Sequence, residues 1–411
     1  MELPDLLVAC YAAAVAAADP RRAVAVAMER RRLTARRPVT VLGLGKAAAA
    51  MAQGVADLVG EVVGVVVTDA DADVPDGIRL VVGGHPVPTA ASLVGGAALV
   101  DAAAGVGPEG LAVVLVSGGG SALAEVPAPR VSLDDLRRTN ELLLRSGAAI
   151  GDVNTVRTHL SALKGGGLAA ALAGVESVTL IVSDVVGDPV EVIASGPMSA
   201  PTGTQADALG VLDRLRLTEA VPPAVIAGLR SGMRPPRATG ADIEVVLGGA
   251  AAAEAACAHA RGAGWDAAVI DTSLTGEAAV VAERLVTMPG LPSIAVFAGE
   301  TTVTVSGDGR GGRNHEAALA AAIAIDGDPD LSFLAAGTDG VDGDSGGAGA
   351  VVDGASAAIA RRLGVDAGDH LGRHDSGGFF DIVPGRLVTG PTGTNVGDVW
   401  LVGRRSGAPP G

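Results

Sequence analysis

Lysine occurs at only two positions in the chain, Lys46 and Lys164, and both positions adjoin glycines. Arginine supplies every other basic side chain except the histidines. A compact, flexible ammonium binds anions in ways that a planar guanidinium does not reproduce, so we expect the two lysines to contact phosphate or another anion. The alternative is that both lysines escaped compositional drift and have no chemical role.

Two glycine-rich turns could bind phosphate oxygens. The first, GLGK, contains Gly43 and Gly45 ahead of Lys46, and the second, SGGGS, consists of Ser117, Gly118, Gly119, Gly120 and Ser121. Both turns follow valine-rich runs and precede helix-like segments, where unhindered backbone N–H groups can point at an anion. GLGKAA also fits the G-x-G-x-x-A fingerprint of dinucleotide-binding folds, with Asp69 after the next run, so nicotinamide binding is an alternative.

A polar stripe is predicted on one helix within the segment NTVRTHLSALKGGG. On a helical wheel, the stripe consists of Asn154, Arg157, Ser161 and Lys164, and the opposite face is apolar. An amide, a guanidinium, a hydroxyl and an ammonium in one row suit a carboxylate or phosphate ligand. His159 projects with the apolar side chains, so we interpret it as a structural histidine.

Charged side chains in later turns could take part in phosphoryl transfer. Asp184 follows a valine-rich run, where a carboxylate can bind a metal ion or activate a hydroxyl, with an Asx turn as the alternative. Arg313 follows two glycines at a helix start and could stabilise a transferring phosphoryl group, unless it only pairs with a nearby acid. In GTDGVDGDSGG, Asp339 is the best candidate metal or substrate ligand. An EF-hand alignment starting at Asp342 fails because Gly346 replaces a ligand.

Valine-rich runs alternate with helix-length segments, which predicts parallel strands joined by right-handed crossovers. The first series of predicted strands is Val39–Leu42, Val62–Thr68, Leu80–Val82, Leu111–Val116 and Val178–Val182. The second series is Ile243–Leu247, Ala267–Ile270, Ile294–Phe297, Thr302–Val305, Phe333–Ala335, Leu387–Val388 and Val399–Val402. Because ligands of open α/β sheets bind at the carboxyl ends of strands, we expect the turns of the first series to converge on one crevice.

A proline- and glycine-rich stretch between Val221 and Asp242 predicts the domain boundary. We therefore expect one domain over residues 1–235 and a second over 241–411, with a last strand that could pack back on the first domain. The segment Thr301–Ser306 follows the preceding strand with almost no linker, which predicts an antiparallel hairpin and a mixed sheet in the second domain.

Composition excludes several classes of protein. A chain of 411 residues with 48% hydrophobic content can bury the cores of two domains. Its net charge of −16 argues against nucleic acid as a partner, despite the arginine-rich segment 30–37. No apolar run is long enough to span a membrane, and no basic region precedes the first apolar stretch as in a secretory signal. Cys10 and Cys257 are far apart in sequence and are interpreted as reduced thiols, so we expect a cytoplasmic protein with small-molecule partners.

The motifs also form an ordered set. They are GLGKAAAAMA, GGHPVP, SGGGSAL, NTVRTHLSALKGGGLA, SDVVGDPVEVIASGP, GGRNHE, GTDGVDGDSGGAGAVVD and TGPTGTNVGD. In this combination the chain resembles the glycerate 2-kinases of the MOFRL type, from about Val39 to Asp398. The resemblance implies an α/β fold with a Rossmann-like N-terminal domain, a smaller mixed C-terminal domain and an active site in the interdomain cleft.

The resemblance also implies an activity, which is ATP-dependent, Mg²⁺-assisted phosphorylation of D-glycerate to 2-phosphoglycerate. Lys46 matches the family's essential lysine, Arg313 its motif arginine and Asp184 the acid of its SDV segment. The chain departs from the family pattern at Thr158, Gly167, His315 and around Asp188, whose role stays open. The alternatives are an NAD(P)-dependent hydroxypyruvate reductase and a non-catalytic sugar-acid sensor. The preferred hydroxy acid also stays open, as does the oligomeric state, for which a homodimer is one possibility.

Overall fold

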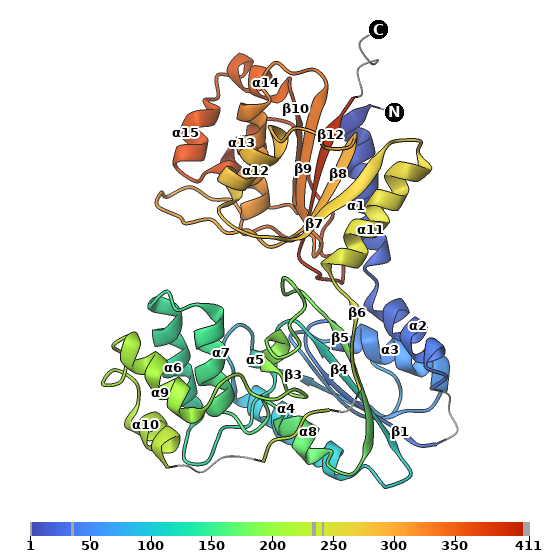
Figure 1. Ribbon diagram of the computed structural model, residues 1–411, viewed down its shortest axis with the longest axis vertical. Coiled ribbons are helices and arrows are strands. Elements are labelled where there is room, and N and C mark those ends of the chain that lie inside the picture. Colours follow the sequence, from blue (N-terminus) through green and yellow to red (C-terminus); the bar gives the residue numbers. More distant parts are fainter. Residues whose placement is uncertain (1, 34–36, 232–235, 241, 406–411) are drawn as a thin grey trace. The chain divides into compact units, whose positions relative to one another are not determined.

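The protein consists of two compact units, which are described from a computed structural model covering residues 2–33, 37–231, 236–240 and 242–405 (Figure 1). The first unit contains Pro20–Ser183 and Asp188–Val246. The second unit contains Met1–Asp19, Asp184–Gly187 and Leu247–Gly411. Each unit is built around its own six-stranded sheet.

The sheet of the first unit has the strand order β3-β2-β1-β4-β5-β6. Its strands are β1 (Val39–Leu44), β2 (Val63–Thr68), β3 (Ile78–Val82), β4 (Leu111–Ser117), β5 (Glu176–Val182) and β6 (Ile243–Leu247). The pairings among β1 to β5 are parallel. Every residue of β4 is buried, as expected for a parallel strand that is covered on both faces. Right-handed crossovers therefore place α3 (Ala48–Val59) and α4 (Ala90–Ala104) on opposite faces of this sheet.

Helices complete the first unit. They are α2 (Pro20–Arg30), α5 (Gly120–Leu123), α6 (Leu133–Arg145), α7 (Ile150–His159), α8 (Gly167–Ala171), α9 (Gln205–Arg214) and α10 (Pro223–Arg230), with a 3₁₀ turn at Ile193–Ser195. Helices α6, α7, α9 and α10 form a group beside the sheet with an apolar core of their own, including Leu143, Val156 and Leu212 (Figure 1). This core fixes the orientation of α7, which carries two of the predicted site residues.

The sheet of the second unit has the order β11-β10-β9-β12-β8-β7. Its strands are β7 (Ala267–Leu274), β8 (Ile294–Gly299), β9 (Leu331–Gly337), β10 (Gly349–Asp353), β11 (Arg386–Leu387) and β12 (Asp398–Arg404). Strand β12 lies antiparallel between β8 and β9, whereas β7 and β8 are parallel. The predicted mixed sheet is therefore confirmed, and β12 belongs to the second unit.

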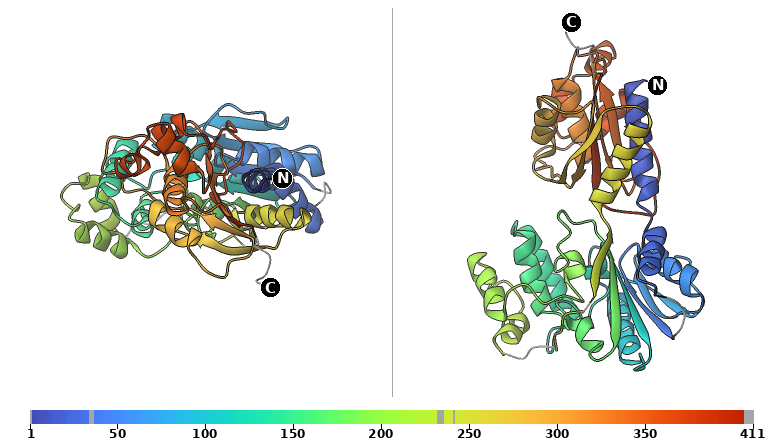
Figure 2. Two further views of the ribbon diagram at one scale, coloured as in Figure 1. Left: turned by 90° about the horizontal axis from the view of Figure 1, so that it is seen from above. Right: turned by 45° about the vertical axis from the view of Figure 1, so that its right-hand side comes forward.

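Helices cover both faces of the second sheet (Figure 2). They are α1 (Leu3–Ala17), α11 (Gly249–Gly262), α12 (Ala278–Val286), α13 (Arg313–Ala324), α14 (Ser356–Arg362), α15 (Ala367–Gly372) and α16 (Ser376–Ile382). Helices α1 and α11 pack together on one face, and α12 and α13 pack together on the other. The core beneath α12 and α13 contains the large side chains Phe297, Phe333 and Trp400.

One predicted strand belongs to the other sheet, one does not form, and one strand was missed. Ile243–Leu247 forms β6 at the edge of the first sheet and does not belong to the second. Thr302–Val305 forms no hairpin, because the Glu277 carboxylate accepts hydrogen bonds from the Thr304 N–H and hydroxyl and holds this segment beside α12. The sequence also gave no signal for β10.

The predicted domain limits at residues 235 and 241 lie outside the described residues, as do residues 34–36 of the arginine-rich segment. Helix α1 packs within the second unit, whereas the sequence placed it in the first domain. Cys10 on α1 and Cys257 on α11 are buried free thiols. Of the described helices, none is by itself long and apolar enough to cross a membrane, although α1 and α2 taken together reach that length.

Candidate active site

The winding of the chain reverses between β1 and β4 in the first sheet. These strands are neighbours in the sheet although β2 and β3 separate them in the sequence. Open α/β sheets bind ligands outside the carboxyl ends of strands at such a switch point. GLGK ends β1 and SGGGS ends β4, so both predicted phosphate-binding turns lie at the switch point.

Hydrogen bonds join these two turns directly. The Lys46 N–H donates to the Gly118 carbonyl at 3.0 Å, and the Ala47 N–H donates to the Ser117 hydroxyl at 3.0 Å. The Gly45 N–H donates to the Val67 carbonyl of β2, also at 3.0 Å. The predicted convergence of the two turns is therefore confirmed. We call GLGK and SGGGS together the glycine cradle.

Glycine is required at two positions of the cradle. Gly45 has a φ of +127°, and a Cβ there would lie 2.2 Å from the Ser117 Oγ. Gly119 has a φ of +81°, and its Cβ would lie 3.2 Å from the Lys46 Cγ and 3.3 Å from the His85 Cδ2. Gly43 was predicted to contact phosphate, but it lies inside β1. There the missing side chain lets β1 pack closely against Val66.

Lys46 is exposed and forms no ion pair with any residue in the described ranges. Its ammonium is therefore available to an anion. His85, which follows β3, lies beside the same turn and was not singled out from the sequence. Burial and the charge of Lys46 lower the pKa of His85, against the opposing charge of Asp69.

The predicted polar stripe is divided between two environments. Asn154 and Arg157 lie on α7, but the helix ends at His159, so Ser161 and Lys164 do not continue its face. The side-chain carbonyl of Asn154 accepts a hydrogen bond from the Ser195 hydroxyl at 3.1 Å, and Ser195 lies 2.9 Å from the Ser121 hydroxyl. This chain of hydrogen bonds ties α7 to the glycine cradle.

Ser161 and Lys164 contact a buried acid that sequence reasoning missed. The Ser161 hydroxyl donates to the Glu125 carboxylate at 2.5 Å, and the Lys164 ammonium forms an ion pair with the same carboxylate. The Lys164 side chain is only 3% exposed, and burial lowers its pKa. Arg237 donates to the carbonyls of Thr158, Ser161 and Lys164 in this segment. The expectation that Ser161 and Lys164 extend the row formed by Asn154 and Arg157 was therefore wrong.

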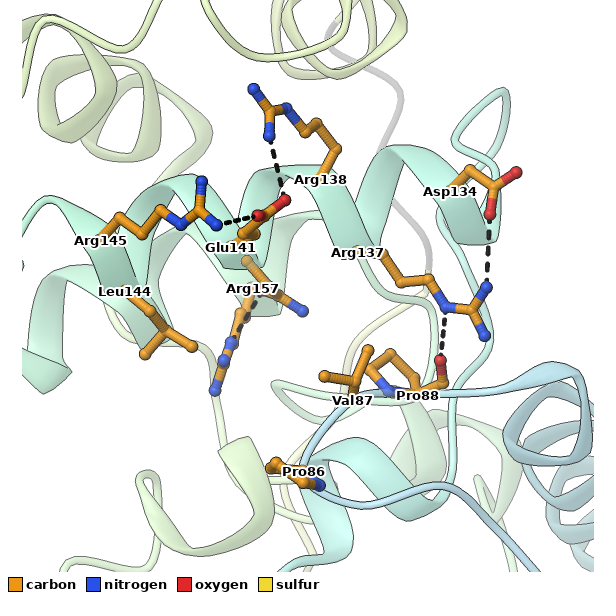
Figure 3. A pocket seen from close by; sticks show the side chains of 11 residues that line it. Pro86, Val87, Pro88, Asp134, Arg137, Arg138, Glu141, Leu144, Arg145 and Arg157 are labelled. Carbon is orange, nitrogen blue, oxygen red and sulfur yellow. Dashed lines mark hydrogen bonds and ion pairs between the residues drawn. The ribbon is translucent and has the colours of Figure 1, made fainter.

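Arg157 lines a pocket of about 650 Å³ in the first unit (Figure 3). The pocket lies between the loop after β3 and helices α6 and α7, and its apolar side chains include Pro86, Val87 and Leu144. The Arg157 Nε donates to the Asn140 side-chain carbonyl at 2.9 Å. Burial lowers the pKa of Arg157, and among the described residues the guanidinium has no ion-pair partner.

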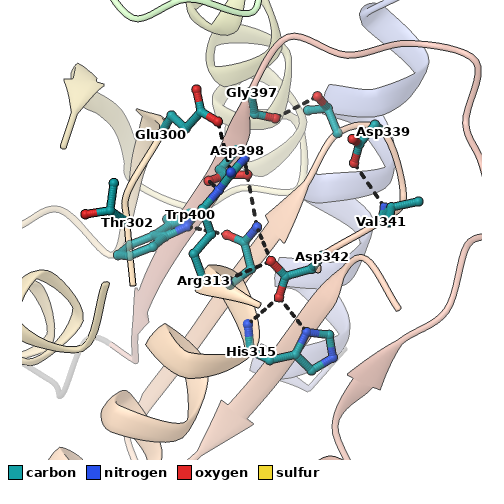
Figure 4. Close-up of polar contacts among 12 residues, drawn as sticks. Glu300, Thr302, Arg313, His315, Asp339, Val341, Asp342, Gly397, Asp398 and Trp400 are labelled. Atoms are coloured by element: carbon teal, nitrogen blue, oxygen red, sulfur yellow. Dashed lines mark hydrogen bonds and ion pairs between the residues drawn. The ribbon is translucent and has the colours of Figure 1, made fainter. Parts of the chain in front are cut away.

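The second unit contains the other predicted cation, Arg313, at the first turn of α13 (Figure 4). Its Nε and Nη2 donate to the two carboxylate oxygens of Asp398 at 2.6 and 3.0 Å, and its Nη1 lies 2.9 Å from Glu300. Burial alone would lower the pKa of Arg313, but the hydrogen bonds and charge of Asp398 outweigh burial and raise it. Two acids therefore hold the Arg313 side chain in place. The side chain is still accessible to a ligand, because 34% of it is exposed.

Asp342 caps the start of α13. This acid was the first position of the rejected EF-hand alignment, and the structure gives it a structural role. Its carboxylate accepts the backbone N–H groups of Asn314 at 3.1 Å and His315 at 2.8 Å (Figure 4). The His315 Nδ1 lies 2.7 Å from the same carboxylate. The Asn314 amide in turn donates to Asp398 at 2.9 Å, so one hydrogen-bonded network orients the start of α13.

The two predicted metal ligands do not belong to a ready-made metal cage. No group of three or more metal-binding side chains occurs among the residues that the structure describes. Asp339 is half-buried, and its carboxylate accepts the Val341 N–H at 3.0 Å in an Asx turn. Asp184 groups with the second unit, and its charge is one of those that raise the pKa of Glu300, after burial and Asp398.

Comparison with known proteins decides the family. Residues 6–230 match a domain of unknown function, DUF4147, and residues 293–398 match the MOFRL family. The chain belongs to the DUF4147–MOFRL family. It is 35% identical to the glycerate 2-kinase of Pyrococcus horikoshii, over 97% of this chain and 97% of the relative. It is similar to the crystal structure of a Thermotoga maritima glycerate kinase, with a TM-score of 0.90, 32% identity and coverage of 98% and 99%.

A further relative in Agrobacterium vitis, 39% identical over 95% of this chain and 92% of its own length, is named as a candidate hydroxypyruvate reductase. Within this DUF4147–MOFRL chain, the DUF4147 match contains the glycine cradle and α7, and the MOFRL match contains Arg313 and Asp398. The resemblance seen in the motifs is therefore confirmed, as is the α/β fold with a parallel and a mixed sheet.

Four residues that lie against predicted site residues within their own unit were not picked out from the sequence: Glu125 and His85 in the first unit, and Asp398 and Glu300 in the second. The sequence held one signal for Glu125, which directly follows the apolar residues Leu123 and Ala124, because an acid buried with such neighbours requires a cation. Asp398 ends the TGPTGTNVGD motif, but only the antiparallel position of β12 beside β8 and β9 brings it to Arg313. No local pattern predicts that contact.

Proposed function

We propose that this protein phosphorylates the 2-hydroxyl of D-glycerate with ATP. The observation that carries the proposal is the glycine cradle, in which two hydrogen-bonded turns surround one exposed lysine at the switch point of a parallel sheet. The relatives named glycerate 2-kinase and glycerate kinase support the same activity. In this proposal Lys46 and the backbone N–H groups of SGGGS hold phosphate oxygens of the nucleotide.

Lys46 also bears on the choice between a kinase and a reductase. An ammonium that is exposed and unpaired among the described residues suits charge that develops on phosphoryl oxygens, and a low-dielectric site increases its effect. A reductase would instead use Asp69, which follows β2, to bind the ribose of a nicotinamide nucleotide. The name of the Agrobacterium vitis relative makes a hydroxypyruvate reductase the second candidate function.

Arg313 is proposed as the second catalytic cation. Its bidentate pairing with Asp398 and its contact with Glu300 hold the guanidinium in one orientation, which lowers the entropy lost when it binds a phosphoryl group. The remaining exposure of its side chain leaves N–H groups for the substrate. A preoriented donor of this kind stabilises the transition state more than the ground state.

Asn154 and Arg157 are proposed to bind an anion of the reaction, either the glycerate carboxylate or a phosphate of the nucleotide. Arg157 is a half-buried cation without an acidic partner among the described residues, which suits a carboxylate or a phosphate. Ser161 and Lys164 would contribute indirectly, because their contacts with Glu125 hold the segment that follows α7.

Asp184 and Asp339 are carboxylates, and Mg²⁺ commonly takes one or two protein carboxylates and completes its shell with water and phosphate. The ion would supply charge neutralisation on the phosphates. We propose Asp184 as the principal ligand and as the acceptor of the substrate hydroxyl proton, with Asp339 as the second carboxylate.

A coupled ADP-release assay tests the function. The purified chain would be given ATP and Mg²⁺ with D-glycerate, L-glycerate, hydroxypyruvate or a tartronate-type acid in turn. The proposal expects ADP release with D-glycerate, and no quenching or enhancement of NADH fluorescence on titration. NADH binding with reduction of hydroxypyruvate would establish the reductase, and glycerate binding without ADP release would establish a sensor.

A further inference from the structure

The pocket beside Arg157 has the size and lining of a site for a nucleoside. Its volume is about 650 Å³, within the range of about 300–1,000 Å³ of typical small-molecule sites. Figure 3 shows Pro86, Val87, Leu144 and the Arg157 guanidinium around the same space. A small hydroxy acid alone would leave most of this apolar wall in water, whereas a flat heterocyclic base with its ribose would cover it.

The charge of the pocket is opposite to that of the chain. Its lining includes four arginines and two acids, a net charge of +2 in a protein of net charge −16. Both acids are engaged, since Asp134 pairs with Arg137 and Glu141 pairs with Arg138 and Arg145 (Figure 3). Arg157 is therefore left to an anion, and a guanidinium also stacks well on an aromatic base.

Two structural connections link the lining of the pocket to the glycine cradle. The loop after β3 places His85 against Gly119 of the cradle, and the next residue, Pro86, already lines the pocket. Arg137 holds the far end of this loop, because its Nε donates to the Pro88 carbonyl at 2.7 Å.

The second connection is α7. Asn154 is tied through Ser195 to Ser121 of the cradle, and Arg157 lies one helical turn further along the same helix. A ligand that spans both places would have an apolar, aromatic end and a strongly anionic end.

We propose that this pocket binds the base and ribose of ATP, with its phosphates running past Arg157 toward Lys46 and the SGGGS turn. The inference rests on the proposed function, because it locates the nucleotide that the reaction consumes. It assigns Leu144 and Val87 as contacts of the base. It also gives the loop after β3 a role in both halves of the nucleotide site.

The test compares binding of ATP, AMP and tripolyphosphate to the full chain by isothermal titration calorimetry. Leu144→Gln removes an apolar wall without changing charge, and Leu144 is 63% exposed, so the fold should be unaffected. The matched control is Ile150→Gln, because Ile150 is 61% exposed and does not line the pocket. Val87→Gln changes the opposite wall and serves as a second variant.

We expect Leu144→Gln and Val87→Gln each to raise the Kd of ATP and AMP about tenfold, which corresponds to about 1.4 kcal/mol. The Kd of tripolyphosphate, which has no base, should stay within about twofold, and Ile150→Gln should match the wild type for all three probes. Unchanged affinity for AMP and ATP in both pocket variants would overturn the proposal. So would a loss of tripolyphosphate affinity as large as that of ATP, or a change of oligomeric state with nucleotide affinity intact.

The outcomes also separate this inference from the proposed function. Wild-type protein that binds AMP in a Leu144-dependent manner but never releases ADP would refute the kinase and keep the nucleotide pocket. Wild-type protein that turns over, with an ATP KM that Leu144→Gln leaves unchanged, would refute the pocket and keep the kinase.

Discussion

The pair of acids that holds Arg313 gives a quantitative prediction. Asp398 is 2% exposed and binds the Arg313 guanidinium through two hydrogen bonds, whereas Glu300 binds the same guanidinium through one contact and is 46% exposed. Breaking a buried ion pair costs about 3–5 kcal/mol, while exposed pairs contribute about 0.2–1 kcal/mol. Arg313 is 34% exposed and can be partly rehydrated, so the lower end of the first range applies.

Asp398→Asn should therefore lower the free energy of unfolding by about 3 kcal/mol, and Glu300→Gln by less than about 1 kcal/mol. For a unit of this size the melting temperature should fall by about 6–12 °C in Asp398→Asn. Differential scanning calorimetry and urea titration measure both variants under the same conditions. Near-equal losses in the two variants, or a fully stable Asp398→Asn, would refute the argument that burial of this carboxylate fixes Arg313.

Three further variants test other parts of the site. Lys46→Ala should lower kcat by about 10² or more, and Lys46→Arg should also fail, so near-normal steady-state kinetics in Lys46→Arg would remove the argument for a compact ammonium. Lys164→Met should lower the free energy of unfolding by about 3–5 kcal/mol, because it leaves the Glu125 carboxylate buried and unpaired. Urea titration measures this loss. Intact stability with a raised KM would instead show that Lys164 binds substrate. His159→Ala should lower the melting temperature and keep kcat within about twofold, since its ring contacts the Gly203 carbonyl, and a stable but inactive variant would reverse this assignment.

Features that depend on neighbouring residues were predictable from the sequence. Valine-rich runs followed by polar or glycine-rich turns identified β1 to β5, and the rule for the carboxyl ends of parallel strands brought GLGK and SGGGS together. The order of the motifs also carried the family. These inferences succeeded because strand length, turn chemistry and crossover handedness are local or nearly local properties of the chain.

Features set by distant residues were not predictable. Helical periodicity continued the polar stripe to Lys164, but α7 ends at His159, and Glu125 and Arg237 hold the chain that follows. The roles of Asp342 and Asp398 depend on the return of β12 and its neighbouring loops to the start of α13. No spacing in a single sequence reports such contacts, since the partners are separated by dozens of residues.

Identification of the reaction product tests the central claim most directly. The full chain would be incubated with ATP, Mg²⁺ and D-glycerate, and the phosphorylated product would be assigned by ³¹P NMR and by coupling to enolase. The account predicts 2-phosphoglycerate, formed in step with ADP and lost in Lys46→Ala. Formation of 3-phosphoglycerate alone, or no phosphorylated product at all, would contradict it.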